Sequence, residues 1–381
     1  MCLLYVLIFK IRDFFVNLKK LFTFGVLYYP AAVFAADVDV RPGDEVNGQQ
    51  IYSGDTQTVN GGTVSNTTIF GGVQEVNDGS VTNTRIDNLG FQDVRGGTVT
   101  GTTIDWGSMN VYGGSATGTI INSWGIQNVF EKGTVTGVTI NNGGRQSVIS
   151  GTVTDTIIND GGRQSVISGT VTDTIINDGG TQNVTGGSVT GTIINNGGTQ
   201  NVDGGSVTDT IINNGGTQNV DGGSVTDTII NDGGTQNVTG GSVTGTIIND
   251  GGTQYVTGGS VTGTIINYRG ELYAHDGSVS NTVINGGLLD AAGLSTVIKN
   301  TVVNNDGHFE VLNGNITDTT INNGSQSIRG NTLVSGTVIN NGGRLAVFDN
   351  SVATDTTVTH GGAVYVYSGT VNNVDVSGQD A

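Results

Sequence analysis

The sequence predicts an all-β protein, a right-handed parallel β-helix of about 18 coils with a period of 18 residues. Three observations favour this fold. The strings GGRQSVISGTVTDTIIND at 143–160 and 161–178 are identical, and five further units repeat the same pattern up to residue 268. Valine, isoleucine and threonine recur at fixed places in each unit, which is typical of short strands. Glycine, 65 of 381 residues, falls between these strands, where the chain must bend.

We number each unit from its first glycine, so that Gly143 is place 1. Valine at places 6 and 11 and isoleucine at place 16 form unbroken columns, which we expect to face inward. Place 15 holds Ile157 in one unit but Arg85 in another, so it faces outward. Because successive residues of a strand point to opposite faces, threonine at place 14 then faces inward with place 16, and glutamine at place 4 with place 6.

The pattern extends on both sides of the regular units. The place-4 column runs from Gln57 to Val364 and counts 18 units. One coil buries only about three aliphatic side chains, at roughly 1.5–3 kcal/mol each, so it cannot fold alone and must stack on its neighbours. Asparagine at place 17, as in Asn159 and Asn177, predicts a ladder of stacked amides along the axis.

Two other solenoids with similar periods do not fit. Calcium-binding nonapeptide repeats need an aspartate at the sixth position of G-G-x-G-x-D-x-U-x, where this chain has valine. Left-handed hexapeptide solenoids need an aliphatic residue at every sixth position, whereas the columns here are five, five and eight residues apart. The spacing therefore favours the right-handed form.

The chain divides into four segments. Residues 1–35 have a basic, apolar beginning and end in small residues, which predicts a signal peptide; the apolar stretch at 21–36 is shorter than the roughly 20 residues of a membrane span. Residues 36–52 form a lead-in or cap, 53–370 the tandem array and 371–381 a tail. Cleavage removes four of the 14 basic residues, one of the 32 acidic ones and the only cysteine, leaving a charge of −21. That charge excludes nucleic acid as a partner.

Catalytic groups are sparse. The histidines, His275, His308 and His360, lie in different units, so we expect no metal, no cofactor and no catalytic residue. The alternative is a carbohydrate-active β-helix enzyme, a polysaccharide lyase or hydrolase, that uses the aspartate columns around Asp155 and Asp173. These columns are interrupted by glycine and have no basic partner, which favours a solvated acidic face.

Places 10 and 12 flank the inward valine at place 11 and form a regular two-column array of hydroxyls. Three functions suit such an array: O-glycosylation, side-by-side docking of identical rods, and ice binding, of which docking fits best because a repetitive face is self-complementary. The candidate residues of this glycosylation or self-association face are Thr152, Thr154, Thr170, Thr172, Ser188, Thr190, Ser206, Thr208, Ser224, Thr226, Ser242 and Thr244.

The unit G-G-x-Q-x-V-x-x-G-x-V-x-x-T-x-I-N resembles the passenger repeat of AIDA-type self-associating autotransporter adhesins over residues 53–370. The resemblance implies export by the signal peptide to the outer surface of a Gram-negative cell. It also implies a role in adhesion, autoaggregation and biofilm growth, and heptosylation of serine and threonine by a glycosyltransferase. The receptor is not readable from the residues.

The sequence departs from this family at both ends. MCLLYVLIFKIRDFF does not reproduce the family's extended signal-peptide opening. After the last coil the chain ends at VDVSGQDA, without the alternating amphipathic strands of an outer-membrane β-barrel. The expectation is therefore a truncated autotransporter whose translocator is absent, at the cell surface, outside the cell, or in the periplasm if no barrel is supplied.

Overall fold

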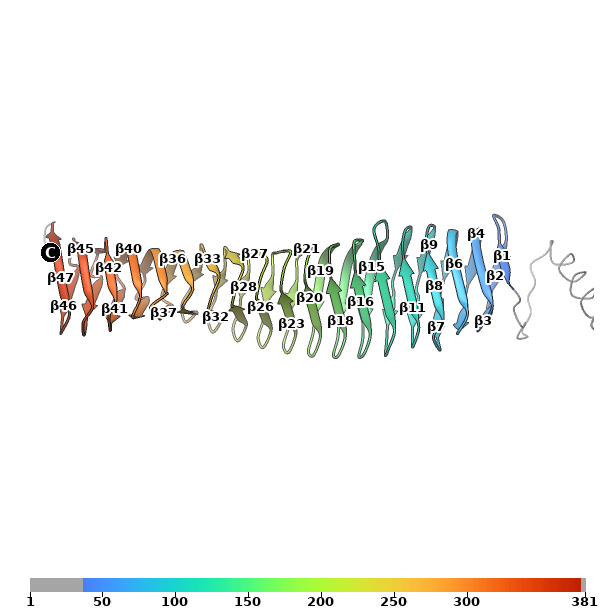
Figure 1. Ribbon diagram of the computed structural model, residues 1–381, viewed down its shortest axis with the longest axis horizontal. Helices are drawn as coiled ribbons and strands as arrows, with labels where there is room; N and C mark the ends of the chain where they lie inside the picture. The colour runs from blue at the N-terminus through green and yellow to red at the C-terminus, as the bar shows by residue number, and fades with distance from the viewer. Residues whose placement is uncertain (1–36, 378–381) are drawn as a thin grey trace, which may run out of the picture.

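The strands of neighbouring coils stack into one continuous rod (Figure 1). The computed structural model describes residues 37–377, and the 47 strands in that range belong to a single sheet. The sheet winds through about 19 turns with an 18-residue period. Coils pair in parallel and in register, as Val153 with Val171 and Val171 with Val189. The predicted class, a right-handed parallel β-helix, is confirmed.

Three faces run along the rod, and each is named after its repeated residue. The glutamine face (places 3–6) consists of β1 Val38–Val40, β8 Phe91–Val94, β11 Ser108–Val111, β14 Ile126–Val129, β16 Arg145–Val148, β18 Arg163–Val166, β20 Thr181–Val184, β23 Thr199–Val202, β26 Thr217–Val220, β29 Thr235–Val238, β32 Thr253–Val256, β35 Glu271–His275, β37 Leu288–Ala292, β39 His308–Leu312, β41 Ser325–Arg329, β44 Arg344–Val347 and β46 Ala363–Val366. The hydroxyl face (places 10–12) consists of β2 Glu45–Asn47, β9 Thr98–Thr100, β12 Ser115–Thr117, β21 Ser188–Thr190, β24 Ser206–Thr208, β27 Ser224–Thr226, β30 Ser242–Thr244, β33 Ser260–Thr262 and β42 Leu333–Ser335.

The isoleucine face (places 14–17) consists of β3 Gln50–Tyr52, β5 Thr68–Phe70, β7 Arg85–Asp87, β10 Thr103–Ile104, β13 Ile120–Ile121, β22 Ile193–Ile194, β25 Ile211–Ile212, β28 Ile229–Ile230, β31 Ile247–Ile248, β34 Ile265–Ile266 and β43 Val338–Asn340. Some strands turn a corner and belong to two faces. Those joining the glutamine and hydroxyl faces are β4 Thr56–Ser65 and β6 Val73–Thr82. Those joining the hydroxyl and isoleucine faces are β15 Thr134–Ile140, β17 Thr152–Ile158, β19 Thr170–Ile176, β36 Ser278–Asn285, β38 Val297–Asn304, β40 Asn315–Asn322, β45 Val352–Val358 and β47 Thr370–Val376.

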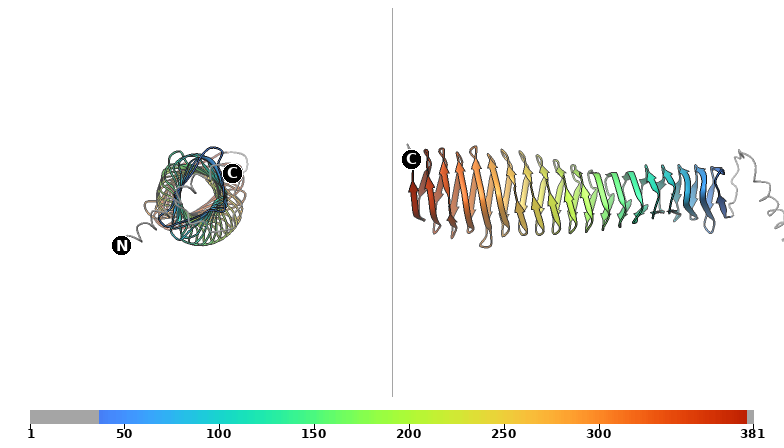
Figure 2. Two further views of the ribbon diagram at one scale, coloured as in Figure 1. Left: turned by 90° about the vertical axis from the view of Figure 1, so that its right-hand side faces the viewer. Right: turned by 90° about the horizontal axis from the view of Figure 1, so that it is seen from above.

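Left-handed residues make the corners between the faces. Gly161 at place 1 has φ +67° and Gly187 at place 9 has φ +76°, and glycine adopts this conformation without steric cost. Place 13 turns the chain from the hydroxyl face to the isoleucine face, and Asp155 has φ +56° there. The chain thus bends three times per unit, and viewed along the axis the coils lie around a common centre (Figure 2).

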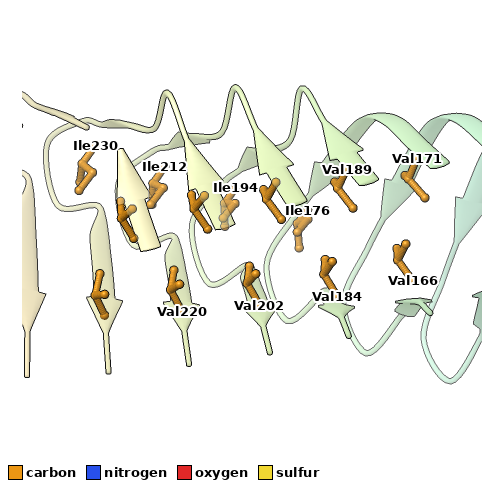
Figure 3. Close-up of a cluster of buried hydrophobic side chains, with 14 of the residues drawn as sticks. Val166, Val171, Ile176, Val184, Val189, Ile194, Val202, Ile212, Val220 and Ile230 are labelled. Carbon is orange, nitrogen blue, oxygen red and sulfur yellow. The ribbon is translucent and has the colours of Figure 1, made fainter. Parts of the chain in front are cut away.

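The core is a set of apolar columns inside the rod. Places 6, 11 and 16 point toward one another from the three faces, as Val184, Val189 and Ile194 do in Figure 3, and all three are fully buried. The inward orientation expected for places 4 and 14 is confirmed, because Gln182 and Thr192 are also fully buried.

The buried glutamines form a hydrogen-bonded ladder that the sequence analysis did not anticipate. From Gln164 to Gln254, each side-chain Nε2 donates to the Oε1 of the preceding coil at 2.5–2.7 Å. The same nitrogen donates to the place-14 threonine eight residues earlier, as Gln200 does to Thr192 at 3.2 Å. A buried amide is costly unless it is paired, and the ladder pairs each one with its copies.

The predicted asparagine ladder at place 17 is present. Each Nδ2 from Asn141 to Asn267 donates to the Oδ1 of the preceding coil at 2.8–3.0 Å. This ladder lies outside the core, where its side chains are half-buried. It therefore ties the coils together along the edge beside the place-1 corner.

The solenoid extends beyond both limits of the tandem array expected from the sequence. Within the lead-in segment, β1 pairs in register with β4, and β3 pairs with β5, so residues 38–52 form one more coil than the 18 expected. At the other end β47 pairs with β45 as far as Val376. The predicted signal peptide, residues 1–35, lies outside the described residues. Between residues 37 and 377, no helix is long and apolar enough to cross a membrane.

Candidate functional site: the hydroxyl face and its neighbours

The hydroxyl face brings all twelve candidate residues together in two parallel columns. Strands β21, β24, β27 and β30 pair so that Ser188, Ser206, Ser224 and Ser242 stand opposite one another. Neighbouring strands of a sheet are about 4.8 Å apart, so this spacing separates successive hydroxyls. The result is a flat lattice of polar groups on a rigid scaffold.

The two columns differ in exposure and in hydrogen bonding. The place-10 side chains, such as Ser206, are exposed. At place 12 most threonines are half-buried, and hydroxyls bond along the column, as Thr172 does to Thr154 at 3.3 Å and Thr208 to Thr190 at 3.0 Å. Across the described coils, no side-chain hydrogen bond engages the place-10 hydroxyls of the candidate set. The place-10 column is therefore the part of the face with free hydroxyls.

The aspartates next to this face have a backbone explanation. Asp155, Asp173, Asp209 and Asp227 at place 13 have φ between +54° and +56°. Aspartate, asparagine and glycine tolerate the left-handed conformation better than other residues, so the alternation of Asp with Gly191 follows from the bend. A shallow groove of about 370 Å³ passes this column and is lined in part by Asp155, Asp173 and Ile157.

Other polar groups are dispersed along the rod. His308 Nδ1 lies 2.8 Å from Ser325 Oγ in the next coil. Burial, together with a 2.9 Å hydrogen bond to Glu271, raises the pKa of Tyr273 to about 12. Within residues 37–377, no group of three or more His, Cys, Asp or Glu side chains is placed to hold a metal ion.

The structure shows one cluster of exposed apolar side chains that the sequence did not lead us to expect. Leu89, Trp106 and Trp124 occupy the place-1 corner of three successive coils, and all three side chains are exposed. The signal was available in the sequence, because the regular units have glycine at that place. The signal is weaker in this part of the chain, because the spacing between successive units varies from 17 to 19 residues.

Comparison with known proteins adds one informative match. No protein-family model matches this chain, and no curated protein does. Among solved structures, a fragment of TibA that had been hyper-glycosylated by TibC is 38% identical, with a TM-score of 0.56. The match covers 68% of this chain and 97% of the TibA fragment, which is an autotransporter adhesin passenger. The chain belongs to the TibA family of adhesin passengers.

Two further solved structures resemble the chain only weakly. The receptor binding domain of the Siphovirus 9NA tailspike is 12% identical, covers 90% of this chain and 71% of its own, and has a TM-score of 0.19. The Streptococcus pneumoniae surface protein and adhesin PfbA is 10% identical, covers 90% of each chain and has a TM-score of 0.10. With TM-scores this low, neither structure informs the fold or the function of the TibA family member described here.

Proposed function

We propose that the chain is the passenger of an AIDA-type adhesin, exported to the cell surface or beyond it, that mediates adhesion, autoaggregation and biofilm growth. The observation that carries the proposal is the 38% identity to TibA over 97% of that fragment. The β-solenoid suits this role because it presents the same surface many times along a stiff rod.

Self-association uses the hydroxyl face. The place-10 hydroxyls are exposed and make no side-chain hydrogen bond among the described residues. A second rod can therefore bond to them without breaking a hydrogen bond inside the first rod. A second rod with the same repeat meets the lattice in register along many coils, and weak contacts then add up over the length.

The test introduces charge on this face and on a matched face of the same coils. Ser206→Arg with Ser224→Arg places two cations in the middle of the lattice, where copies repel each other. Thr199→Arg with Thr217→Arg makes the same change of charge at place 3 of the glutamine face, where the regular units already carry Arg145 and Arg163.

Sedimentation velocity of the purified mature chain measures the assembly state, and clumping of cells that display it measures the activity. We expect the hydroxyl-face variant to be monomeric and the glutamine-face variant to associate like the parent chain. A parent chain that stays monomeric, or a hydroxyl-face variant that still associates, contradicts the proposal.

The exposed place-10 hydroxyls are also the proposed acceptors for a glycosyltransferase. The support is that the TibA fragment was glycosylated by TibC, and that only exposed, unpaired hydroxyls can reach a transferase site. After coexpression with TibC, mass spectrometry should find sugar on Ser188, Ser206 and Ser224 in preference to Thr190 and Thr208. Modification confined to place 12, or none at all, contradicts this assignment.

A further inference from the structure

The place-1 corner carries an apolar cluster on three successive coils near the N-terminal end of the rod. It lies between the isoleucine face (β7, β10, β13) and the glutamine face (β8, β11, β14). Leu89, Trp106 and Trp124 are its members, with 70%, 54% and 64% of their surface exposed. The sequence has two tryptophans in all, and both are in this cluster, which we call the tryptophan corner.

The backbone at this corner is in an unfavourable conformation for such large side chains. Leu89, Trp106 and Trp124 have φ of +64°, +58° and +61°, where bulky residues are rare. The regular units place glycine at the same point of the coil, as Gly161 with φ +67°. The fold alone therefore favours glycine here, and more than half of the surface of each of these three residues stays exposed.

Hydrogen bonds between coils hold the three residues in place. Leu89 N donates to Trp106 O at 2.6 Å, Trp106 N to Ser123 O at 3.2 Å, and Trp124 N to Gly143 O at 3.2 Å. The indole rings of the two tryptophans lie 5.6 Å apart, tilted by 35°. The corner is thus an aromatic surface on a hydrogen-bonded backbone, and it projects into solvent, where a ligand can reach it.

Polar side chains border this aromatic surface. Arg85 makes ion pairs of 3.1 Å with both Asp87 and Asp105, and Asn122 Nδ2 donates to Asp105 Oδ1 at 2.8 Å. Asp105 directly precedes Trp106, and Asn122 is two residues before Trp124. The arginine and two aspartates together carry one negative charge, so the border disfavours anions while offering carboxylate and amide groups to hydroxyls.

We propose that the tryptophan corner binds a neutral saccharide. A pyranose ring has an apolar face of C–H groups that stacks on an indole, and a rim of hydroxyls that bonds to carboxylate and amide groups, and the corner offers both. A second copy of the chain is disfavoured because three side chains offer far less than the ~800 Å² per partner of a stable interface. A membrane surface is disfavoured because Arg85, the basic residue at the border of the corner, is already paired with two aspartates, and anionic headgroups attract clusters of unpaired basic residues.

Tryptophan fluorescence of the mature chain reports on this corner alone, since the sequence has no other tryptophan. We would titrate the purified chain with mannohexaose, cellohexaose and a hexamer of N-acetylglucosamine, and with polygalacturonate as the anionic comparison. The expected result is a saturable change in emission with at least one neutral oligosaccharide and at least tenfold weaker binding of polygalacturonate. No change with any of the neutral probes overturns the proposal.

Two other outcomes also overturn it. A shift produced by phosphatidylcholine vesicles but not by sugars assigns the corner to lipid, and a shift that depends on protein concentration alone assigns it to a second copy. The single variants Trp106→Gly and Trp124→Gly should each weaken sugar binding at least tenfold by calorimetry. Both should fold, because the regular units carry glycine at this place.

Tyr268→Asn is the matched control. Tyr268 is 67% exposed at the same edge of a distant coil, where other units have asparagine or aspartate, and its removal should leave sugar binding unchanged. The inference names a ligand for the adhesin proposed above and so rests on that function. The two are separable, because fluorescence titration tests the corner without reference to clumping, and the hydroxyl-face variants leave the corner intact.

Discussion

Substituting one glutamine in the middle of the buried ladder should destabilise the coils around it. In Gln200→Leu, the Oε1 of Gln182 loses its donor, the Oγ1 of Thr192 loses its donor, and Gln218 loses one of its two acceptors. Leucine fits the space, since Leu272 occupies the same column. The perturbation is therefore the loss of hydrogen bonds without a change of burial.

The magnitude follows from the groups left unpaired. Each buried acceptor without a partner costs about 1–3 kcal/mol, so two cost about 2–6 kcal/mol. The leucine side chain recovers about 1–2 kcal/mol through its apolar surface. The difference between the midpoints of these two ranges is a net loss of about 2.5 kcal/mol, and we expect it to be concentrated in the coils that contain residues 182–218.

The natural end of the ladder provides the comparison. The Oε1 of Gln254 and the Oγ1 of Thr264 have no partner, because the next coil has Leu272 in the column. Leu272→Gln supplies donors for both atoms and leaves only its own Oε1 unpaired. It should therefore be neutral or stabilising, although it exchanges an apolar side chain for a polar one in the core.

Urea unfolding followed by circular dichroism measures the overall effect, and hydrogen exchange resolved by peptide locates it. Local exchange is the stronger readout, because coils of a solenoid open partly independently of one another. If Gln200→Leu unfolds within 0.5 kcal/mol of the parent chain and exchange in residues 182–218 is unchanged, the ladder does not stabilise the rod, and the reasoning is wrong.

Three further predictions concern single places in the coil. At the left-handed place 13, Asp173→Gly should leave the free energy of unfolding unchanged, while Asp173→Val should lower it by about 1–2 kcal/mol because a β-branched residue resists this conformation; equal effects in thermal unfolding would contradict the backbone explanation. Gly180→Ala should lower stability by about 1–3 kcal/mol, because its Cβ would lie 2.6 Å from the carbonyl oxygen of Ile158, and an unchanged melting temperature would show that the coils can separate to admit it. Tyr273 should ionise at a pH of about 12 rather than 10.0, so the stability that its neutral form contributes is complete below pH 10 and is lost as the pH rises through 12. The difference in absorbance at 295 nm between the parent chain and Tyr273→Phe measures the pH at which Tyr273 ionises. Glu271→Gln should move that ionisation to lower pH.

The fold was predictable because each core residue packs on copies of itself in the neighbouring repeat units. In a parallel solenoid, the residue that packs on Val189 is its copy 18 positions away, Val171 or Val207. A column that stays apolar through every unit therefore identifies the core directly, and a column that changes from isoleucine to arginine identifies the surface. The first coil was missed because Val38, not glutamine, stands opposite Gln57.

The candidate site was only partly predictable. Alternation along the strand placed both hydroxyl columns outside, but it could not distinguish the free hydroxyl of Ser206 from the bonded one of Thr208. That difference depends on the side-chain rotamers and on the spacing between coils. The repeat pattern specifies neither the rotamers nor the spacing.

The repeat predicted the period, the stack, the inward columns and the outer asparagine ladder, because each depends on contacts between identical places of successive coils. Three other features became visible in the three-dimensional structure. It gave the amides of Gln182 and Gln200 their partners, it showed that Asp155 occupies a left-handed bend, and it brought Trp106 and Trp124 to one corner. These three features depend on backbone angles and on the directions of side chains. Both are set by the closing and stacking of the coils, so the repeat pattern does not reveal them.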